Sequence, residues 1–323
     1  MKHFSKAIVF KALLIAASIA AIGIIAGCTS GLNEVYDINN IFFSYTTVSD
    51  SDGKYIIITK HIASQSDIKI PDDIYGVPVR EIADSVFEKD EMIKTVKFGK
   101  NMRRIGNNAF GNCTNLESVS FNVSMSDIGE YAFQECTSLP SAELPKNLRS
   151  LGRGAFYGCK SLGELSIPDG IESIGGRAFS GTAWLKEHAK ENYVTVCNGI
   201  LIAYNGNKTE ITVPKGIRHI SGAFAGKTLL ESVTLRNGIT AIGDMAFMGC
   251  SSMKEINIPS TVTEIGNSAF YGCKSVRKLV IPDSVQSIGS DAFKDCRAAL
   301  FVKEGSYAEK YCADNGLDCF TMK

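Results

Sequence analysis

Cysteine is the residue type in this chain with the most evident capacity for chemistry. Six of the ten cysteines recur at one position of a repeating pattern, namely Cys113, Cys136, Cys159, Cys250, Cys273 and Cys296. Three equivalent cysteines in each block cannot all pair in disulfides, and no histidine stands at zinc-ligand spacing beside them. We therefore predict a buried column of free thiols. Cys312 and Cys319 remain candidates for a disulfide in an oxidising compartment.

Cys28 differs from the others because of the residues that precede it. A basic stretch, Met1 to Lys11, leads into an apolar run, Ala12 to Ala26, and Gly27 stands directly before the cysteine. This arrangement resembles the lipobox of bacterial lipoprotein precursors, which implies cleavage before Cys28 and diacylation of its sulfur. The acyl chains would then anchor the protein to a membrane surface. The alternative is a plain signal peptide or an uncleaved anchor with a coincidental cysteine.

Two further stretches share only part of a known ligand-binding motif. Gly222 to Thr228 ends like a phosphate loop, but three residues instead of four separate its glycines. Asp50-Ser51-Asp52-Gly53 lacks the later ligands of a calcium loop, and a hairpin turn explains it. Neither Gly-x-Ser-x-Gly nor His-Glu-x-x-His occurs. We expect no enzyme activity, no cofactor and no metal site.

The charge of the chain argues against a nucleic-acid partner. The sequence holds 34 basic and 34 acidic residues, and Lys2, Lys6 and Lys11 all fall in the N-terminal segment. The remainder therefore carries a formal charge of about −3. No basic field for nucleic acid is implied.

The elements that must position these residues are repeats of 23 residues. The phrase Ile-Gly-x-x-Ala-Phe-x-x-Cys-x-x-Leu recurs, and its phenylalanines are Phe87, Phe110, Phe133, Phe156, Phe179, Phe224, Phe247, Phe270 and Phe293. Every step is 23 residues except the one from Phe179 to Phe224, which is 45. Self-similarity at this period predicts a solenoid in which each unit contacts mainly its neighbours.

Each unit also contains one alternating apolar segment. Leu116, Val119 and Phe121 illustrate it, and a proline such as Pro145 often follows it. Alternation predicts a strand with one buried face, and proline ends the ladder because it has no N–H. Stacked units would place these strands in a parallel sheet.

Before and between the repeats the pattern changes. The segments 41–80 and 183–219 contain hairpin signals, and Trp184 lies in a short helical stretch of the second segment. Trp184 is predicted to anchor this modified unit, with a role in partner binding as the alternative. The predicted organisation is a signal peptide at 1–27, a flexible tether at 28–40, an N-terminal β cap at 41–80, and repeats at 81–299 with the modified unit at 183–219.

The full phrase Ile-Pro-x-x-Val-x-x-Ile-Gly-x-x-Ala-Phe-x-x-Cys, present at 258–273 and 281–296, resembles the BspA-type leucine-rich repeats of bacterial surface proteins. The resemblance covers roughly residues 60–323. It implies a curved leucine-rich-repeat solenoid with short parallel strands on the concave face, exported and associated with adhesion. It also implies a closing strand and short helix at 300–323. It brings no catalytic residues.

In such a solenoid the residues between the buried strand positions point outward from the concave sheet, where a partner would bind. The candidate partner-binding residues are Lys94, Lys97, Glu117, Ser118, Ser120, Glu143, Glu164, Ser166, Glu231, Thr234, Lys254, Glu255, Asn257, Arg277 and Lys278. The alternative is that most of them only keep the surface soluble.

These observations favour a lipid-anchored, surface-exposed module that binds a protein, with a host matrix or cell-surface protein as the expected ligand. The alternative is a non-adhesive scaffold of the cell envelope. Both interpretations place the chain at a bacterial cell membrane or outer membrane.

Replacing the lipid-bearing sulfur tests the interpretation of the N-terminus. We expect Cys28→Ser to abolish incorporation of radiolabelled fatty acid and to release the protein from the membrane fraction, because the acyl chains supply the anchor. A lipid-labelled, membrane-bound Cys28→Ser protein would show that the anchor lies elsewhere.

Overall fold

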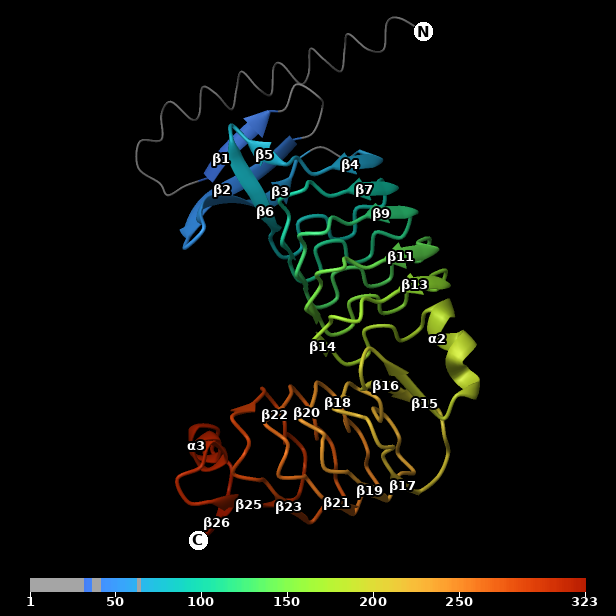
Figure 1. Cartoon of the computed structure of the whole chain (residues 1–323), viewed down its shortest axis with the longest axis vertical. Coiled ribbons are helices and arrows are strands. Elements are labelled where there is room, and N and C mark those ends of the chain that lie inside the picture. The colour runs from blue at the N-terminus through green and yellow to red at the C-terminus, as the bar shows by residue number, and fades with distance from the viewer. Residues whose placement is uncertain (1–31, 37–41, 63–64) are drawn as a thin grey trace, which may run out of the picture.

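The solenoid predicted from the repeats is the architecture of the chain. A computed structural model describes residues 32–36, 42–62 and 65–323. In it two runs of stacked coils meet at a bend (Figure 1). We call residues 65–182 the first arm and residues 200–303 the second arm. The predicted signal peptide and Cys28 lie outside the described residues and stay predictions.

The N-terminal cap begins with antiparallel strands. Strands β2, Phe42–Asp50, and β3, Gly53–His61, form the predicted hairpin. Strand β1, Leu32–Tyr36, pairs antiparallel with β2. These five residues belong to the segment 28–40 predicted as a tether, so a tether could occupy only part of that segment. Pairing with β1 satisfies backbone groups that an unpaired β2 edge would leave open.

One ladder of parallel strands, which we call the inner ladder, runs along each arm. After the six-residue β6, its strands in the first arm have only two residues each, and the equivalent residues of adjacent coils are 23 apart. Its members are β6 Val77–Ile82, β8 Arg104–Ile105, β10 Asp127–Ile128, β12 Ser150–Leu151, β14 Ser173–Ile174, β16 Ile200–Tyr204, β18 His219–Ile220, β20 Ala241–Ile242, β22 Glu264–Ile265 and β24 Ser287–Ile288. A short β5, Asp73–Ile74, pairs antiparallel with β6.

A second set of parallel strands, the outer ladder, contains the alternating segments predicted from the sequence. It is divided into four sheets. Their strands are β4 Asp67–Lys69, β7 Thr95–Lys97 and β9 Ser118–Ser120; β11 Ser141–Glu143 and β13 Glu164–Ser166; β17 Glu210–Thr212, β19 Ser232–Thr234 and β21 Glu255–Ile256; and β23 Lys278–Val280, β25 Ala299–Lys303 and β26 Cys319–Met322.

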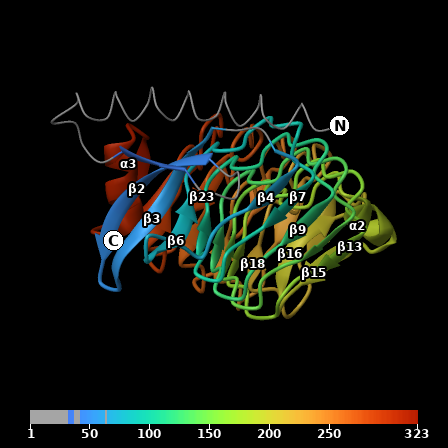
Figure 2. The ribbon, with the colours of Figure 1, turned by 90° about the horizontal axis from the view of Figure 1, so that it is seen from above.

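The two ladders lie on opposite sides of the bend. In Figure 1, β6 and β14 of the first arm and β18, β20 and β22 of the second arm border the open space between the arms. The labelled strands of the outer ladder lie on the far side of each arm. Seen from above, the first arm lies over the second (Figure 2). The inner ladder therefore forms the concave side and the outer ladder the convex side.

The modified unit connects the arms. It consists of helix α2, Ala183–Glu187, a 3-10 turn, His188–Lys190, and strand β15, Tyr193–Val196, which pairs antiparallel with β16. The helix and hairpin predicted for this segment are confirmed. Trp184 packs edge-on against Phe179 at 5.7 Å between ring centroids, in agreement with its predicted anchoring role.

A column of stacked phenylalanine rings forms the centre of each arm. From Phe87 to Phe179 and from Phe224 to Phe293, successive ring centroids are 4.7 to 6.2 Å apart. Each Phe N–H except that of the last ring in each run donates to the alanine carbonyl of the next coil, for example Phe156 to Ala178 at 2.8 Å. Apolar burial and this backbone pairing together join one coil to the next.

The repeated cysteines form the predicted column of buried thiols. Cys113, Cys136, Cys159, Cys250 and Cys273 are fully buried, while Cys296 is half-buried. Each of the five buried thiols donates to the carbonyl of the phenylalanine one coil earlier, as Cys159 does to Phe133 at 3.0 Å. Burial raises the pKa of Cys113 and of Cys250 to about 12, so these side chains stay neutral.

The predicted closing strand and helix are confirmed at the C-terminus. Helix α3, Tyr307–Asp314, is capped by Ser306, whose hydroxyl accepts from the Glu309 N–H, and it covers the last coil. The sequence did not predict β26. Cys312 and Cys319 are both free in the structure. No helix within the described ranges is long and apolar enough to cross a bilayer.

Glycine after the inner strand lets neighbouring coils approach closely. A Cβ atom added at Gly152 would lie 2.4 Å from the backbone of Gly129 and Glu130 in the preceding coil. The equivalent positions Gly106, Gly129, Gly175, Gly243, Gly266 and Gly289 would each place a Cβ within 2.3 to 2.7 Å of another atom. Such distances force a shift, so any side chain at these positions pushes two coils apart.

We expect Gly152→Ala to lower the free energy of unfolding by about 1–3 kcal/mol, because the methyl group overpacks a contact between backbones. Gly163→Ala is the matched control, since its added Cβ would meet nothing closer than 3.9 Å. Its effect should stay within about 0.5 kcal/mol. Urea unfolding followed by circular dichroism measures both, and equal stability of the two variants would contradict the role given to Gly152.

Candidate functional site

The prediction that the candidate partner-binding residues lie on the concave face is wrong, because their strands lie on the convex side of the bend. Their strand members belong to β7, β9, β11, β13, β19, β21 and β23 of the outer ladder, and nearly all of these side chains are exposed. The sequence showed alternation only where strands have three residues. The inner strands are too short to show it, so the concave face went unnoticed.

Charges on this convex face partly neutralise each other between coils. Lys254 Nζ lies 2.7 Å from Glu231 Oε2, and Lys94 Nζ lies 3.8 Å from Glu117 Oε1. In the part of the chain that is described, Arg277 makes no ion pair. Arg277 is therefore the candidate cation of the second arm that is more available to an acidic partner than Lys254.

Six of the candidate residues meet at one depression, which we call the outer groove. It has a volume of about 730 Å³ and lies between β21 and β23. The candidates among its lining residues are Thr234, Lys254, Glu255, Asn257, Arg277 and Lys278. Ile256, Ile258 and Val280 supply apolar surface, and Val280 is 42% exposed. The groove thus combines apolar surface with an excess of basic groups.

The groove coincides with a break in the outer ladder. Strands β21 and β23 belong to separate sheets, although they lie in consecutive coils. Asn257 follows β21, and its side chain accepts from the Leu235 N–H at 3.0 Å and donates to the Leu235 carbonyl at 3.1 Å. The amide thereby replaces backbone pairing toward the preceding coil. The side toward β23 is left open.

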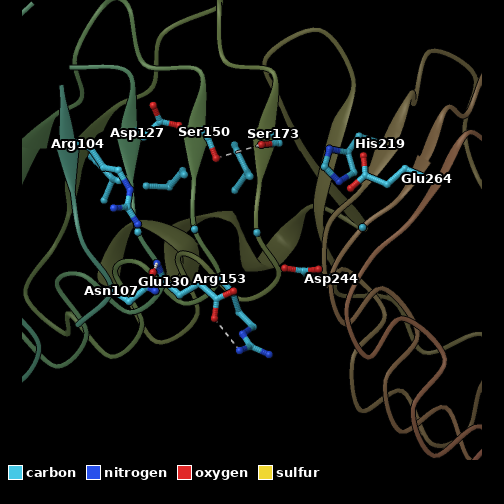
Figure 3. Close-up of a pocket in the computed structure, with 17 residues that line it drawn as sticks. Arg104, Asn107, Asp127, Glu130, Ser150, Arg153, Ser173, His219, Asp244 and Glu264 are labelled. Atoms are coloured by element: carbon cyan, nitrogen blue, oxygen red, sulfur yellow. Dashed lines mark hydrogen bonds and ion pairs between the residues drawn. The ribbon is translucent and has the colours of Figure 1, made fainter. Parts of the chain in front are cut away.

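A second site lies on the concave side and was not predicted, and we call it the inner corner. It is a cavity of about 300 Å³ lined by inner-ladder residues of both arms (Figure 3). Ser150, Ser173 and Arg153 come from the first arm, whereas His219 and Glu264 come from the second. The residue type at the position before each repeated isoleucine varies along the chain, and this variation was the signal in the sequence. The search for alternating apolar residues did not consider that position.

The modified unit brings the two arms together at this corner. The hydroxyl of Ser221 donates to the Ile174 carbonyl, and Arg218 Nη2 donates to the Ile171 carbonyl at 3.4 Å. A Cβ added at Gly176 would lie 2.3 Å from the Asp244 carbonyl oxygen. These contacts fix the inner rows of the arms against each other.

The lining of the inner corner is acidic. Its carboxylates are those of Asp127, Glu130, Asp244 and Glu264, and its guanidinium groups are those of Arg104 and Arg153. Both arginines are already paired, Arg153 with Glu130 at 2.6 Å and Arg104 with Glu81 at 3.3 Å. The acidic groups of the second arm have no such partner among the described residues. Within those residues, no group of His, Cys, Asp or Glu side chains is placed to hold a metal ion.

Burial shifts the ionisation of the second-arm groups. It raises the pKa of Asp244, although the Asn267 N–H donates to its Oδ1 at 2.7 Å, and it raises the pKa of Glu264, to which the Asp244 charge also contributes. His219 is 7% exposed, and burial lowers its pKa to about 4, with the nearby Arg218 charge acting in the same direction. The imidazole is therefore neutral at pH 7.

This buried imidazole makes stability depend on pH. Between pH 6.5 and about 4 the unfolded chain holds a proton on His219 that the folded chain does not, so stability falls as the pH falls through this window. The loss attributable to His219 is about 3 kcal/mol and is complete below about pH 4. Asp244 opposes it, since a raised carboxyl pKa favours the folded state at low pH.

We expect His219→Gln to remove this component, because glutamine does not titrate. Urea unfolding at intervals from pH 7 to pH 4 gives the free energy of unfolding at each pH. Over this range that free energy should fall by about 3 kcal/mol less in the variant than in the unmodified chain. All other titratable groups, His61 included, are the same in both proteins, so the unmodified chain is the control for their contribution. Parallel pH profiles for the two proteins would mean that folding does not shift the pKa of His219.

The family model that matches this chain describes the same repeats. The BspA type leucine rich repeat region matches residues 80–199 and 202–305, in six copies. A Treponema pallidum leucine rich repeat protein is 24% identical, with 72% of this chain and 87% of that chain covered and a TM-score of 0.42. A leucine rich cell surface protein from Faecalibacterium prausnitzii A2-165 is 23% identical, covering 92% and 100%, with a TM-score of 0.40. The pneumococcal vaccine antigen PcpA is 17% identical, covering 91% and 100%, with a TM-score of 0.41. No curated protein matches the chain.

Leucine-rich-repeat solenoids are typically scaffolds for protein interaction and not enzymes. The matched repeats extend over more than half of the chain and coincide with its stacked coils. This chain belongs to the BspA-type leucine-rich-repeat family.

Proposed function

We propose that the chain is an exported, lipid-anchored module that binds a host or neighbouring-cell protein through its convex face. The outer groove carries this proposal. It gathers six candidate residues at the place where β21 and β23 separate. A solenoid holds such variable side chains on a constant core, which suits recognition of a large, extended partner.

The groove is best matched by an extended acidic segment. Lys254, Arg277 and Lys278 supply positive charge, and Glu255 is the one acidic residue in the lining. Glu231 neutralises Lys254 in part, and Lys278 Nζ lies 4.6 Å from the centre of the Phe301 ring. Arg277 is therefore the group with most to gain from a carboxylate, to which a guanidinium can donate in bidentate fashion.

The groove also offers apolar and backbone contacts. Val280 is exposed, and Ile256 and Ile258 are half-buried, so a partner side chain would remove apolar surface from water. The open side of the β21–β23 break suits an extended main chain, as in recognition by strand addition. Proteins that bind in this way obtain affinity from main-chain bonds and specificity from neighbouring pockets.

The predicted lipid on Cys28 would hold this face near the membrane. The outer groove lies more than 200 residues after Cys28 in the sequence, so the predicted lipid would anchor the chain at the end remote from the groove. We propose that the module is displayed at the cell surface. Protease treatment of intact cells should then degrade it, whereas an inward-facing envelope scaffold would be protected.

Charge reversal in the groove tests the binding face. We expect the double variant Arg277→Glu and Lys278→Glu to lower affinity for soluble poly-L-glutamate and for a bound host matrix protein about tenfold, and to make the remaining binding less sensitive to salt, because the attraction that salt screens has been removed. Biolayer interferometry with a panel of matrix proteins measures both effects.

Lys310→Glu is the matched control, because Lys310 is exposed on α3 and lies outside the groove. It should bind like the unmodified chain. If the double variant and Lys310→Glu bind equally well, the groove is not the binding face. The same outcome with poly-L-glutamate alone would exclude an acidic partner there.

A further inference from the structure

We propose that the inner corner binds a primary ammonium group. The site does not depend on the proposed function of the convex face, because none of its lining residues belongs to the outer groove. It is lined by residues of both arms, with Ser150 and Ser173 on one side and His219 and Glu264 on the other (Figure 3).

The first argument is the charge that the cavity leaves uncompensated. Arg153 and Arg104 each form an ion pair with a glutamate, and the Arg153 charge also acts on Asp244, so two guanidinium groups stand against the four carboxylates of the lining. Asp244 and Glu264 make no ion pair among the described residues, and the Asp244 charge contributes to the raised pKa of Glu264. A cation placed between them relieves the repulsion that the Asp244 charge exerts on Glu264.

The second argument is independent of the carboxylates. His219 is 93% buried, and its ring lies at the cavity wall against Gly243, where a Cβ would meet Nε2 at 2.3 Å. Among the described residues, burial and the Arg218 charge are what lower the pKa of this imidazole, and no hydrogen bond contributes. A neutral imidazole has one acceptor nitrogen, so at the cavity wall it can accept a hydrogen bond from a donor placed in the cavity.

The volume of the cavity and the hydrogen-bond acceptors in its lining indicate the class of ligand. Alkylammonium offers three N–H donors, which match two carboxylates and one neutral imidazole nitrogen. The volume of about 300 Å³ is at the lower limit of ligand sites and admits a small organic molecule or one long side chain. A bare metal ion is disfavoured, because the acidic and imidazole groups of the described residues are not placed to coordinate one.

Such an ammonium could come from a lysine side chain of a partner protein or from a free amine. Ala241 separates His219 from Glu264 along the inner ladder, with each of the three in register with the next. The small side chain leaves room above the ladder between the two polar groups. Ser150 and Ser173, whose hydroxyls lie 3.4 Å apart, present further polar contacts across the cavity.

Titration of the full chain with matched ligands tests the proposal. The probes are Nα-acetyl-lysinamide and glucosamine, and the neutral controls are Nα-acetyl-norleucinamide and N-acetylglucosamine. Isothermal calorimetry at pH 7 should show binding of at least one amine and at least tenfold weaker binding of its neutral analogue. Binding of the lysine derivative alone identifies a protein side chain as the source, and binding of glucosamine alone identifies a free amino sugar.

A variant locates the binding. Glu264 makes no hydrogen bond to another described residue and lies on an exposed position of β22, so Glu264→Gln should preserve the fold, which its melting temperature verifies. It should weaken amine binding at least tenfold. Glu304→Gln removes an exposed carboxylate near the C-terminal cap and should leave amine binding unchanged.

Three results would overturn the proposal: no binding of either amine, equal binding of an amine and its neutral analogue, or equal affinity of the Glu264→Gln and Glu304→Gln proteins. The first two comparisons use the unmodified chain and so do not depend on any variant folding. Amine binding should also survive Arg277→Glu with Lys278→Glu, so failure at this corner and failure at the outer groove are distinguishable.

Discussion

The close approach of neighbouring coils along the inner ladder is the constraint on which the remaining structure depends. Inner strands of two residues can pair only if the chain that follows them passes directly over the preceding coil. Gly152 lies over Gly129 and Glu130 with no room for a methyl group. The same translation from coil to coil places Phe156 over Phe133 and directs the Cys159 thiol to the Phe133 carbonyl. Glycine, phenylalanine and cysteine therefore recur as one set.

Curvature follows from holding one side of each coil close while the other side is free to separate. Strands of the inner ladder pair with their neighbours throughout each arm, whereas the outer ladder breaks between β9 and β11 and again between β21 and β23. On a bent stack the convex side must span the longer path, so its hydrogen bonds are the ones to open. The outer groove occupies the second break. A recognition surface on the convex side is thus produced by packing on the concave side.

The sequence predicted the parts of this fold that repeat. Period, core and capping elements were readable because Ile, Gly, Phe and Cys positions face the same environment in every coil. The assignment of Lys94 or Glu164 to the concave face failed for a physical reason. Both ladders consist of parallel strands that bury apolar residues. The apolar pattern therefore predicts a strand, but it does not indicate whether that strand lies on the concave or the convex side of the bend. Two residues in each coil, such as Asn108 and Asn112, have a left-handed backbone conformation that forms the turns. Different residue types occupy these two positions from coil to coil, so the sequence did not reveal them.

The inner corner could not be predicted because it arises from an exception to the repeat. The step of 45 residues omits one residue before Phe224 and inserts the unit containing α2. The second arm consequently meets the first at an angle, with Gly176 against the Asp244 backbone. A regular solenoid would place the positions of Ser173, His219 and Glu264 in one exposed row. The bend folds that row upon itself, and folding buries His219 and raises the pKa of Asp244. Burial of polar groups at a bend costs stability, and a ligand that supplies their missing partner would recover it.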